Sequence, residues 1–521
     1  MIYLRLLVCG LLTCSAWRAG VASETDALTI GSRGKQPMVL LAIDDQSLPL
    51  KDNLCYYLSK PEVRQEPVLK PERDNSKAAD ELAAHFYGTV LHDQGKYRMW
   101  YYGVRRAGNG AKIACQICYA ESDDGIYWQK PTLEQVEING SKANNAVALV
   151  NVDTQGVCVI KDDDDPDPHR RYKMVVQYMP RDYPTLKTAT SPDGFHWTDC
   201  GDLPARQFRE ISSFFKHDGM YVVCGHTPST GDQGQSRGRQ GFAWISPDFK
   251  QWPQEEAKSF WLPEPPGAKG YNSKWEQPFD QVHLGVGAAS YGNVAVGLYG
   301  LWRQRGWGEE GTTCDFGLVL SNDGLHFREP IPGHVFMKSE DEKLPAVPDR
   351  HLPTILCQAN GILNVGDETR IYYGRWRNSE WPLEGDGRNY YADVALATLP
   401  RDRWGALGLA PKSEEGSLWT APIRLPAGGC VVSLNADSAD RMRVDVADER
   451  FQLLPEFSGE NGGVSAQTSG LNCVVSWPGE RLHQLAGRTV RLRLQFNKKE
   501  ADPRLFAIYL TSQSTADENG K

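Results

Sequence analysis

One eight-residue stretch decides the fold, Thr190-Ser191-Pro192-Asp193-Gly194-Phe195-His196-Trp197, because the chain writes its pattern five times. The pattern is a hydroxyl residue, any residue, an aspartate (Pro400 in the last copy), three residues and then Trp or Phe. The hydroxyl and the carboxylate can accept hydrogen bonds from a tight turn, and glycine supplies its positive φ. The ring begins a return strand. The other copies span 122–128, 246–252, 321–327 and 398–404.

The copies begin 55 to 77 residues apart, which indicates one structural unit repeated five times. Each unit has a strand, an aromatic-rich second strand, a variable loop, a third strand, the Ser-x-Asp turn and a fourth strand. Four-stranded units arranged around a ring form a β-propeller, so we predict five blades over residues 23–411. A solenoid is the structural alternative, and the long, uneven loops disfavour it. The second strands are expected at 96–102, 171–176, 220–224, 293–299 and 370–374.

The chain after the last copy changes character. Residues 415–515 contain short alternating strands separated by turn residues, which predicts a β-sandwich and an all-β fold class. Residues 23 to about 80 are irregular and rich in proline, and we expect them to wrap around the first repeat.

Composition limits the partners. The net charge of −9 makes nucleic acid an unexpected partner, whereas 15 Trp and 21 Tyr suit both β-structure and the apolar faces of sugars. Residues 1–22 combine Arg5, an apolar run and a small-residue cleavage site, which predicts a signal peptide and a secreted or periplasmic protein. The apolar run is too short to span a bilayer, so we expect no membrane partner.

Two motifs suggest chemistry that their context disfavours. Cys115 and Cys118 lie within an expected strand and have no second pair of ligands, so we interpret them as structural; the disulfide connectivity of the other cysteines stays open. The acidic run 162–165 could suggest calcium, but we interpret it as a solvated turn. We therefore predict no metal and no cofactor.

The first residues of the inner strands should converge at one end of a propeller. Alignment of the blades on their second strands brings together Tyr87, Gly156, Glu210, His283 and Asn360. A carboxyl with apolar neighbours can stay protonated near neutral pH and donate a proton. Glu210 is the candidate for this role, and its alternative is an exposed or salt-bridged residue at the start of a strand.

The repeated hairpins, the strand pair 210–221 and the trailing sandwich resemble the glycoside hydrolases with a five-bladed propeller, families 32 and 43 and their relatives. The resemblance covers nearly the whole mature chain. It implies that Glu210 is the general acid. It also implies an aspartate at the head of blades one and two, where this chain has Tyr87 and Gly156, while Asp80, Glu81 and Asp153 lie out of register.

The missing second group is expected from blade four. Asp280 and His283 should lie at the same end as Glu210, one of them as base or orienting group, although His283 could also be a hydrogen-bonded channel residue. Loops that combine Trp and Arg suit an acidic sugar through stacking and bidentate contacts, or else pack onto the propeller. With Tyr87 and Asn360, the predicted substrate-binding residues are Arg105, Trp302, Arg303, Trp376, Arg377 and Trp381.

These features predict an exported glycoside hydrolase that acts on a poly- or oligosaccharide. Two alternatives stay open. The absence of acids at Tyr87 and Gly156 favours a non-catalytic carbohydrate-binding propeller. Arginines that hold phosphate would instead indicate a glycoside phosphorylase.

Overall fold

The computed structural model describes residues 30–31, 37–107, 113–149, 154–179, 184–204, 209–230, 236–263, 281–304, 312–341, 354–356, 359–377, 390–479, 481–499 and 501–512. These residues form strands and short 3-10 helices. The 3-10 helices are Pro168–Arg170, Ser339–Asp341, Ala439–Arg441, Pro455–Phe457, Gly459–Asn461 and Arg481–Leu485. In this part of the chain, no helix has the length and apolar character to cross a membrane.

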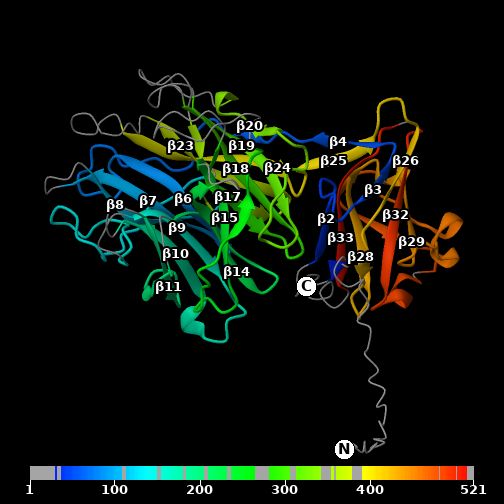
Figure 1. Ribbon diagram of the computed structural model, residues 1–521, viewed down its shortest axis with the longest axis horizontal. Coiled ribbons are helices and arrows are strands. Elements are labelled where there is room, and N and C mark those ends of the chain that lie inside the picture. Colours follow the sequence, from blue (N-terminus) through cyan, green and yellow to red (C-terminus); the bar gives the residue numbers. More distant parts are fainter. Residues whose placement is uncertain are drawn as a thin grey trace, which may run out of the picture.

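Five antiparallel sheets form the predicted propeller (Figure 1). Blade one contains β6 (Ala83–Asp93), β7 (Lys96–Arg106) and β8 (Ile113–Ser122). Blade two contains β9 (Thr154–Lys161), β10 (Tyr172–Tyr178), β11 (Thr185–Ser191) and β12 (Thr198–Asp202). Blade three contains β13 (Glu210–His217), β14 (Met220–Thr230), β15 (Ser236–Ser246) and β16 (Ala257–Phe260). Blade four contains β17 (Gln281–Ser290), β18 (Ala295–Gln304), β19 (Thr312–Ser321) and β20 (Val335–Met337). Blade five contains β21 (Thr354–Leu356), β22 (Ile362–Val365), β23 (Glu368–Arg377), β24 (Tyr391–Pro400) and, from far upstream, β5 (Glu62–Val63).

The inner strands close a ring, because each of β6, β9, β13, β17 and β22 contacts the next and β22 contacts β6. The predicted second strands coincide with β7, β10, β14, β18 and β23, although the predictions for β10 and β18 begin one and two residues too early. The five-bladed propeller is therefore confirmed.

The Ser-x-Asp turn does more than close its own hairpin. Ser191 Oγ accepts hydrogen bonds from the amides of Asp193 and Gly194, and Asp193 Oδ1 accepts from the next two amides. The carbonyls of the same turn accept from the preceding blade, from Arg98 Nη2 at 2.7 Å and Trp100 Nε1 at 3.1 Å. Tyr372 in blade five, Arg170 in blade two and His217 in blade three contact the turns of blades one, three and four in the same way. The repeated motif thus joins neighbouring blades.

Substitution of Gly194 tests this junction between blades. Gly194 has a φ of +84°, and an added Cβ would lie 2.8 Å from Arg98 Nη2 and 2.9 Å from the Trp100 ring. Gly201 has a φ of +97° with nothing within 4 Å of an added Cβ. We expect Gly201→Ala to cost about 1 kcal/mol of unfolding free energy, and Gly194→Ala about 1–2 kcal/mol more because it also overpacks the junction. Equal losses in denaturant titrations of the two variants would contradict the role of the junction.

The second domain has two layers of strands. One layer pairs β2 (Met38–Leu41), β33 (Arg504–Ser512), β28 (Cys430–Asp437), β25 (Gly405–Leu409) and β4 (Leu54–Leu58). The other pairs β3 (Leu50–Asp52), β26 (Glu415–Trp419), β32 (Thr489–Asn497), β29 (Met442–Ala447) and β30 (Gly463–Ser465), with β27 (Ile423–Arg424) and β1 (Ile30–Gly31) at its side. Strand β31 (Gly470–Ser476) pairs with both layers, and a single apolar core lies between them. The predicted β-sandwich is confirmed.

The structure differs from the expected domain boundaries at the N-terminal segment. Strands β2, β3 and β4 belong to the sandwich, and β5 closes blade five, so this part of the segment does not wrap around the first repeat. Residues 68–80 do pack against blade one, as expected. The reason is visible in β2, where Met38 and Leu40 enter the sandwich core while Val39 and Leu41 pack against blades four and five. A strand buried on both faces needs a continuous apolar run, which this segment has.

The acidic run of blade two is only partly the expected solvated turn. The side chains of Asp163 and Asp164 are 67% and 87% exposed, whereas Asp162 and Asp165 form a buried ion-pair network. The side chain of Asp162 is 2% exposed, and it contacts Lys173 Nζ at 3.1 Å and Lys216 Nζ at 2.8 Å. Tyr221 donates a further hydrogen bond to it. Burial alone raises the pKa of Asp162, but the hydrogen bonds from Lys216, Tyr221 and Lys173 outweigh it and lower the pKa to about 2. The carboxylate therefore stays charged and neutralises two lysines that join blades two and three.

Cysteines and metal ligands add no cross-links to the part of the chain that the structure describes. Its free thiols include Cys55, Cys118, Cys158, Cys200, Cys224, Cys430 and Cys473. Its His, Cys, Asp and Glu side chains form no group of three that could hold a metal ion. The predicted signal peptide 1–22 lies outside the described residues.

Candidate active site

Glu210 is the first residue of β13, at the end of the ring where the inner strands begin. Its side chain is only 15% exposed, and His226 Nδ1 lies 3.6 Å from Oε2. Burial raises the pKa of Glu210, and the positive charge of Arg239 only partly opposes this effect. No carboxylate contributes to the shift among the described residues. A buried carboxyl of this kind holds its proton to a higher pH than an exposed glutamate does.

Two histidines beside Glu210 are held neutral. His226 lies directly opposite Glu210 in the pairing of β13 with β14, and His283 lies near the start of β17. Burial lowers the pKa of both imidazoles well below the usual range, and the nearby charge of Arg239 adds to the effect. Neither ring therefore carries a positive charge near neutral pH.

The protonation of His283 follows from its contacts. Arg239 Nη1 lies 2.9 Å from His283 Nδ1, and a guanidinium can only donate, so Nδ1 is the acceptor and the proton of the neutral ring is on Nε2. His283 Nε2 is buried and has no hydrogen-bond partner among the described residues. The ring stacks on Trp302 with centroids 4.3 Å apart and an interplanar angle of 16°. His283 is thus a positioned N–H donor, which disfavours the base role that we predicted as one of two options for it.

Arg239 links these groups. Its guanidinium lies 5.7 Å from the Trp302 ring centroid, and its backbone amide donates to Gln281 Oε1 at 2.7 Å. Among the described residues, it forms no ion pair with a carboxylate within 4.0 Å, and its side-chain hydrogen bond goes to a neutral ring. Arg239 therefore has cationic and hydrogen-bonding capacity left for an anionic ligand group.

Aromatic rings form the blade-one side of the site. Tyr87 is 9% exposed, and burial raises its pKa well above the usual range, with the charges of Tyr390 and Glu210 adding to the effect. The Tyr102 ring is 5.4 Å from Tyr87 and stacks on His85 at 4.6 Å. Trp376 meets His85 edge-on at 6.0 Å. Burial lowers the pKa of His85 to about 3, so it is a neutral member of this aromatic wall.

Irregular pairing of the inner strands aims these side chains. The register shifts between His85 and Thr89 in β6, between Ile211 and Ser213 in β13, and between His283 and Val286 in β17. Bulges bend a strand and re-aim its side chains, and they are frequent next to active sites. All three lie beside residues of the site, in blades one, three and four.

The predicted site residues fall into three groups. Contacts within the site join Glu210, Tyr87, His283, Trp302 and Trp376, as described above. Arg303 is instead held by Asp315 at 2.6 Å, and Arg105 Nη1 bonds the carbonyl of Arg106, so neither is seen to reach Glu210. Asp280 and Trp381 lie outside the described residues, as does the side chain of Arg377.

Asn360 has a structural role in place of the predicted contact with substrate. Its Nδ2 donates to the carbonyls of Phe214, at 2.6 Å, and Val159, while its Oδ1 accepts from the Phe214 amide at 2.9 Å. Its backbone also bonds Gly88 and Val90. The side chain is therefore used to tie blades two and three together inside the ring, while the backbone of the same residue bonds blade one.

The resemblance implies an acid at the head of blades one and two, and neither position has one. At Gly156 the reason is steric, and the acids close to Tyr87 in the sequence have other partners. An added Cβ at Gly156 would lie 2.9 Å from Ile211 Cγ2, so a carboxylate has no room beside Glu210. Asp80 is bound by Lys130 Nζ at 2.6 Å and by Tyr101 Oη at 2.8 Å. Glu81 is bound by Arg106. Asp80 and Glu81 are thus already paired, and Asp153 lies outside the described residues.

Sequence reasoning missed His85, Tyr102, His226, Arg239 and Tyr390. His226 could have been found by extending the second strand of blade three, because it then pairs with Glu210. Arg239 lies on the third strand, opposite Pro228, and nothing in the sequence fixes that register.

No family model matches the chain. Two uncharacterized proteins from two Mycobacterium tuberculosis strains share 33% and 31% identity with it over 116 residues, which is 22% of this chain. The match spans only about a third, 34%, of each of these relatives.

Solved structures of similar architecture have low sequence identity to the chain. A glycosyl hydrolase from Bacteroides ovatus shares 16% identity with a TM-score of 0.44, covering 67% of this chain and 95% of that one. A β-1,2-mannobiose phosphorylase from Listeria innocua shares 13% with a TM-score of 0.38, covering 67% and 97%. A family 43 arabinoxylan arabinofuranohydrolase from Bacillus subtilis shares 10% with a TM-score of 0.37, covering 83% and 96%. At these levels of similarity, function has to be inferred from the site of this chain.

Proposed function

We propose that the protein is an exported carbohydrate-active enzyme that cleaves glycosidic bonds, with Glu210 as the acid that protonates the leaving oxygen. The observation that carries this proposal is the raised pKa of a buried carboxyl at the shared end of the inner strands. Around it lie flat rings that suit a sugar face, Tyr87, Trp302 and Trp376, and hydrogen-bond donors at Arg239 and His283. The predicted signal peptide supports export.

Hydrolysis needs a second group in addition to this acid. A glycoside hydrolase uses two carboxyls that flank the scissile bond, the second as base or nucleophile. His283 does not fit the role of base, since Arg239 occupies its Nδ1 and its Nε2 carries the proton. Asp280 is therefore our proposed partner for Glu210 in hydrolysis.

Phosphorolysis is the second candidate, and one observation favours it. Phosphate is itself the nucleophile in this reaction, so a single carboxyl acid suffices. Arg239 and the Nε2–H of His283 offer a cation and a neutral donor that could hold such an anion beside Glu210.

One assay tests the proposed function. The full chain is incubated with a panel of neutral and acidic oligosaccharides, with and without inorganic phosphate, and products are separated as free sugars and sugar phosphates. Free sugar without phosphate indicates hydrolysis, and sugar phosphate indicates phosphorolysis. Binding of a panel member without any cleavage would instead favour the non-catalytic carbohydrate-binding propeller.

Arg239→Gln separates the two candidates. If phosphate is the nucleophile, the loss of one charge-assisted hydrogen bond, about 1.5–3 kcal/mol, should raise the KM for phosphate at least tenfold. Arg171→Gln, at an exposed arginine paired with Asp163, is the matched control and should leave this KM unchanged. An unchanged phosphate KM in Arg239→Gln would contradict a phosphate site at this residue.

A further inference from the structure

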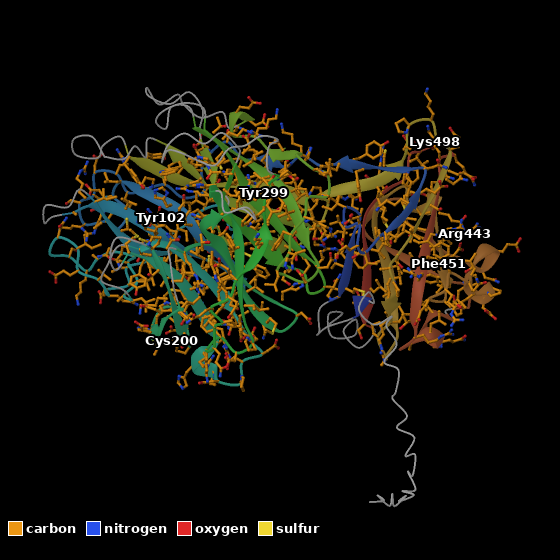
Figure 2. All side chains as sticks on the ribbon, viewed as in Figure 1. Tyr102, Cys200, Tyr299, Arg443, Phe451 and Lys498 are labelled. Atoms are coloured by element: carbon orange, nitrogen blue, oxygen red, sulfur yellow. The ribbon has the colours of Figure 1, made fainter. Side chains whose placement is uncertain are left out.

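A polar groove lies on the outer layer of the sandwich. Strands β3, β26, β32, β29 and β30 lie side by side there, and the other layer packs against the propeller. Figure 2 shows Arg443 and Phe451 on the side of this domain that faces away from the propeller. The groove has a volume of ≈ 470 Å³, and its lining includes Arg441, Arg443, Arg493, Gln495, Asn497 and Lys499.

Two arginines in this groove have no carboxylate partner among the described residues. Arg443 lies directly opposite Gln495, and Arg493 is two residues from Gln495 on the same strand, so the two arginines are diagonal neighbours on one face of the sheet. Such neighbours lie about 7–8 Å apart, within the reach of long side chains. Arg493 Nε is buried without a hydrogen-bond partner in the described part of the chain.

Acidic side chains also line this groove, and each has a partner. Asp52 accepts a hydrogen bond from Asn53 Nδ2 at 3.3 Å. Asp440 contacts Arg441 Nε at 3.3 Å, and Glu415 accepts a hydrogen bond from Asn497 Nδ2 at 3.1 Å. Asp445, buried on the same face and directly opposite Arg493 in the pairing of β29 with β32, accepts from Gln495 Nε2 and from the amide of Gly459. Four basic side chains, Arg441, Arg443, Arg493 and Lys499, and three acidic ones therefore line the groove, which leaves an excess of one positive charge.

Aromatic rings continue the groove beyond Arg493. The Arg493 guanidinium lies 5.6 Å from the Trp419 ring centroid, and Arg491 lies 4.1 Å from that of Phe451. The two rings meet edge-on at 5.2 Å, and Phe451 is 40% exposed. One exposed and one half-buried ring beside guanidinium groups suit a ligand with both flat apolar faces and negative groups.

We propose that this groove binds a segment of acidic polysaccharide, with Arg443 and Arg493 on its carboxylate or sulfate groups and the Trp419–Phe451 pair against its sugar rings. This proposal rests on the proposed function in one respect: the propeller site would cleave the polysaccharide that the groove holds. Because the groove faces away from the propeller, the two sites take different parts of a long polymer.

The test is binding of the full chain to polygalacturonate, dextran sulfate and neutral dextran, measured by calorimetry at low and at physiological salt. Arg443→Gln combined with Arg493→Gln should weaken binding of an acidic polymer at least tenfold. The matched control, Lys77→Gln with Lys142→Gln, removes the same charge from exposed propeller residues and should change binding less than twofold. Equal thermal midpoints would show that both variants fold. A preference for polygalacturonate identifies the carboxylate as the bound group, and one for dextran sulfate identifies the sulfate.

Three outcomes would overturn the groove assignment. They are unchanged binding in the double arginine variant, neutral dextran bound as tightly as the acidic polymers, and duplex DNA bound as tightly as polygalacturonate. Glu210→Gln should bind acidic polymer normally, because its change lies in the propeller. A chain that binds through the arginines but cleaves nothing would overturn the proposed function and confirm the groove.

Discussion

Replacement of Glu210 by glutamine is expected to lower kcat by about 10²–10⁴-fold on a natural glycoside, because this is the usual contribution of a positioned general acid. Glutamine keeps the size of the side chain and can still donate to a neighbour, so loss of a packing contact would not explain such a drop. The effect should be measured on the first substrate that the panel assay identifies.

The leaving group distinguishes an acid from a structural residue. An aryl glycoside with a nitrophenolate leaving group needs little protonation, so Glu210→Gln should retain most of its activity on that substrate. Glu121→Gln, at a glutamate paired with Lys96 on the outer part of blade one, is the control and should behave as wild type on both substrates. Equal losses of Glu210→Gln on the natural and the aryl glycoside would exclude the role of acid.

The pH profile gives a second measure of the same residue. Because burial raises the pKa of Glu210, the active protonated form should persist above pH 4.3, about the ordinary pKa of a glutamate. Activity should then fall as the pH rises through the raised pKa, and this basic limb should be missing from the residual activity of Glu210→Gln.

Replacement of Asp162 by alanine is expected to lower the unfolding free energy of the propeller by about 3 kcal/mol. Removal of one member of a buried ion pair leaves the other charge uncompensated, which typically costs about 3–5 kcal/mol. Lys173, whose side chain is fully buried, would keep Asp165 at 2.9 Å, which places the expected loss at the lower end. Denaturant titration followed by tryptophan fluorescence measures it.

A neighbour in the same acidic run supplies the control. The side chain of Asp163 is 67% exposed, so Asp163→Ala should change stability by no more than about 0.5 kcal/mol. The depressed pKa of Asp162 also sets a pH window: its contribution is complete above the unfolded pKa of about 3.9 and is lost as the pH falls towards about 2. Equal effects of the two alanine variants would contradict the buried network.

Local chemistry accounts for the parts of the fold that the sequence predicted. The turn at Ser191 and Asp193 needs only neighbours within five residues, so each copy could be recognised separately and counted. The position of Glu210 followed from its distance to the second strand of its own blade. Predictions that depended on one hairpin at a time were thus within reach.

Contacts between distant segments account for what was missed. The Arg239 guanidinium reaches His283 from another blade, 44 residues away, through a register that only the folded sheet defines. Gly156 carries no side chain because Ile211 of the next blade fills that space. Asp162 was expected in solvent because its two lysine partners, Lys173 and Lys216, lie on other strands.

The pairing of β2 with β33 has a consequence for biosynthesis. Met38 of β2 meets Leu510 of β33, so two strands some 470 residues apart along the chain pair with each other. In blade five, β24 likewise pairs with β5, which lies some 330 residues earlier in the chain. Contacts this distant along the chain are slow to form. A nascent chain would therefore carry the apolar run from Met38 to Ile43 unpaired until β33 is made, a state that chaperones recognise.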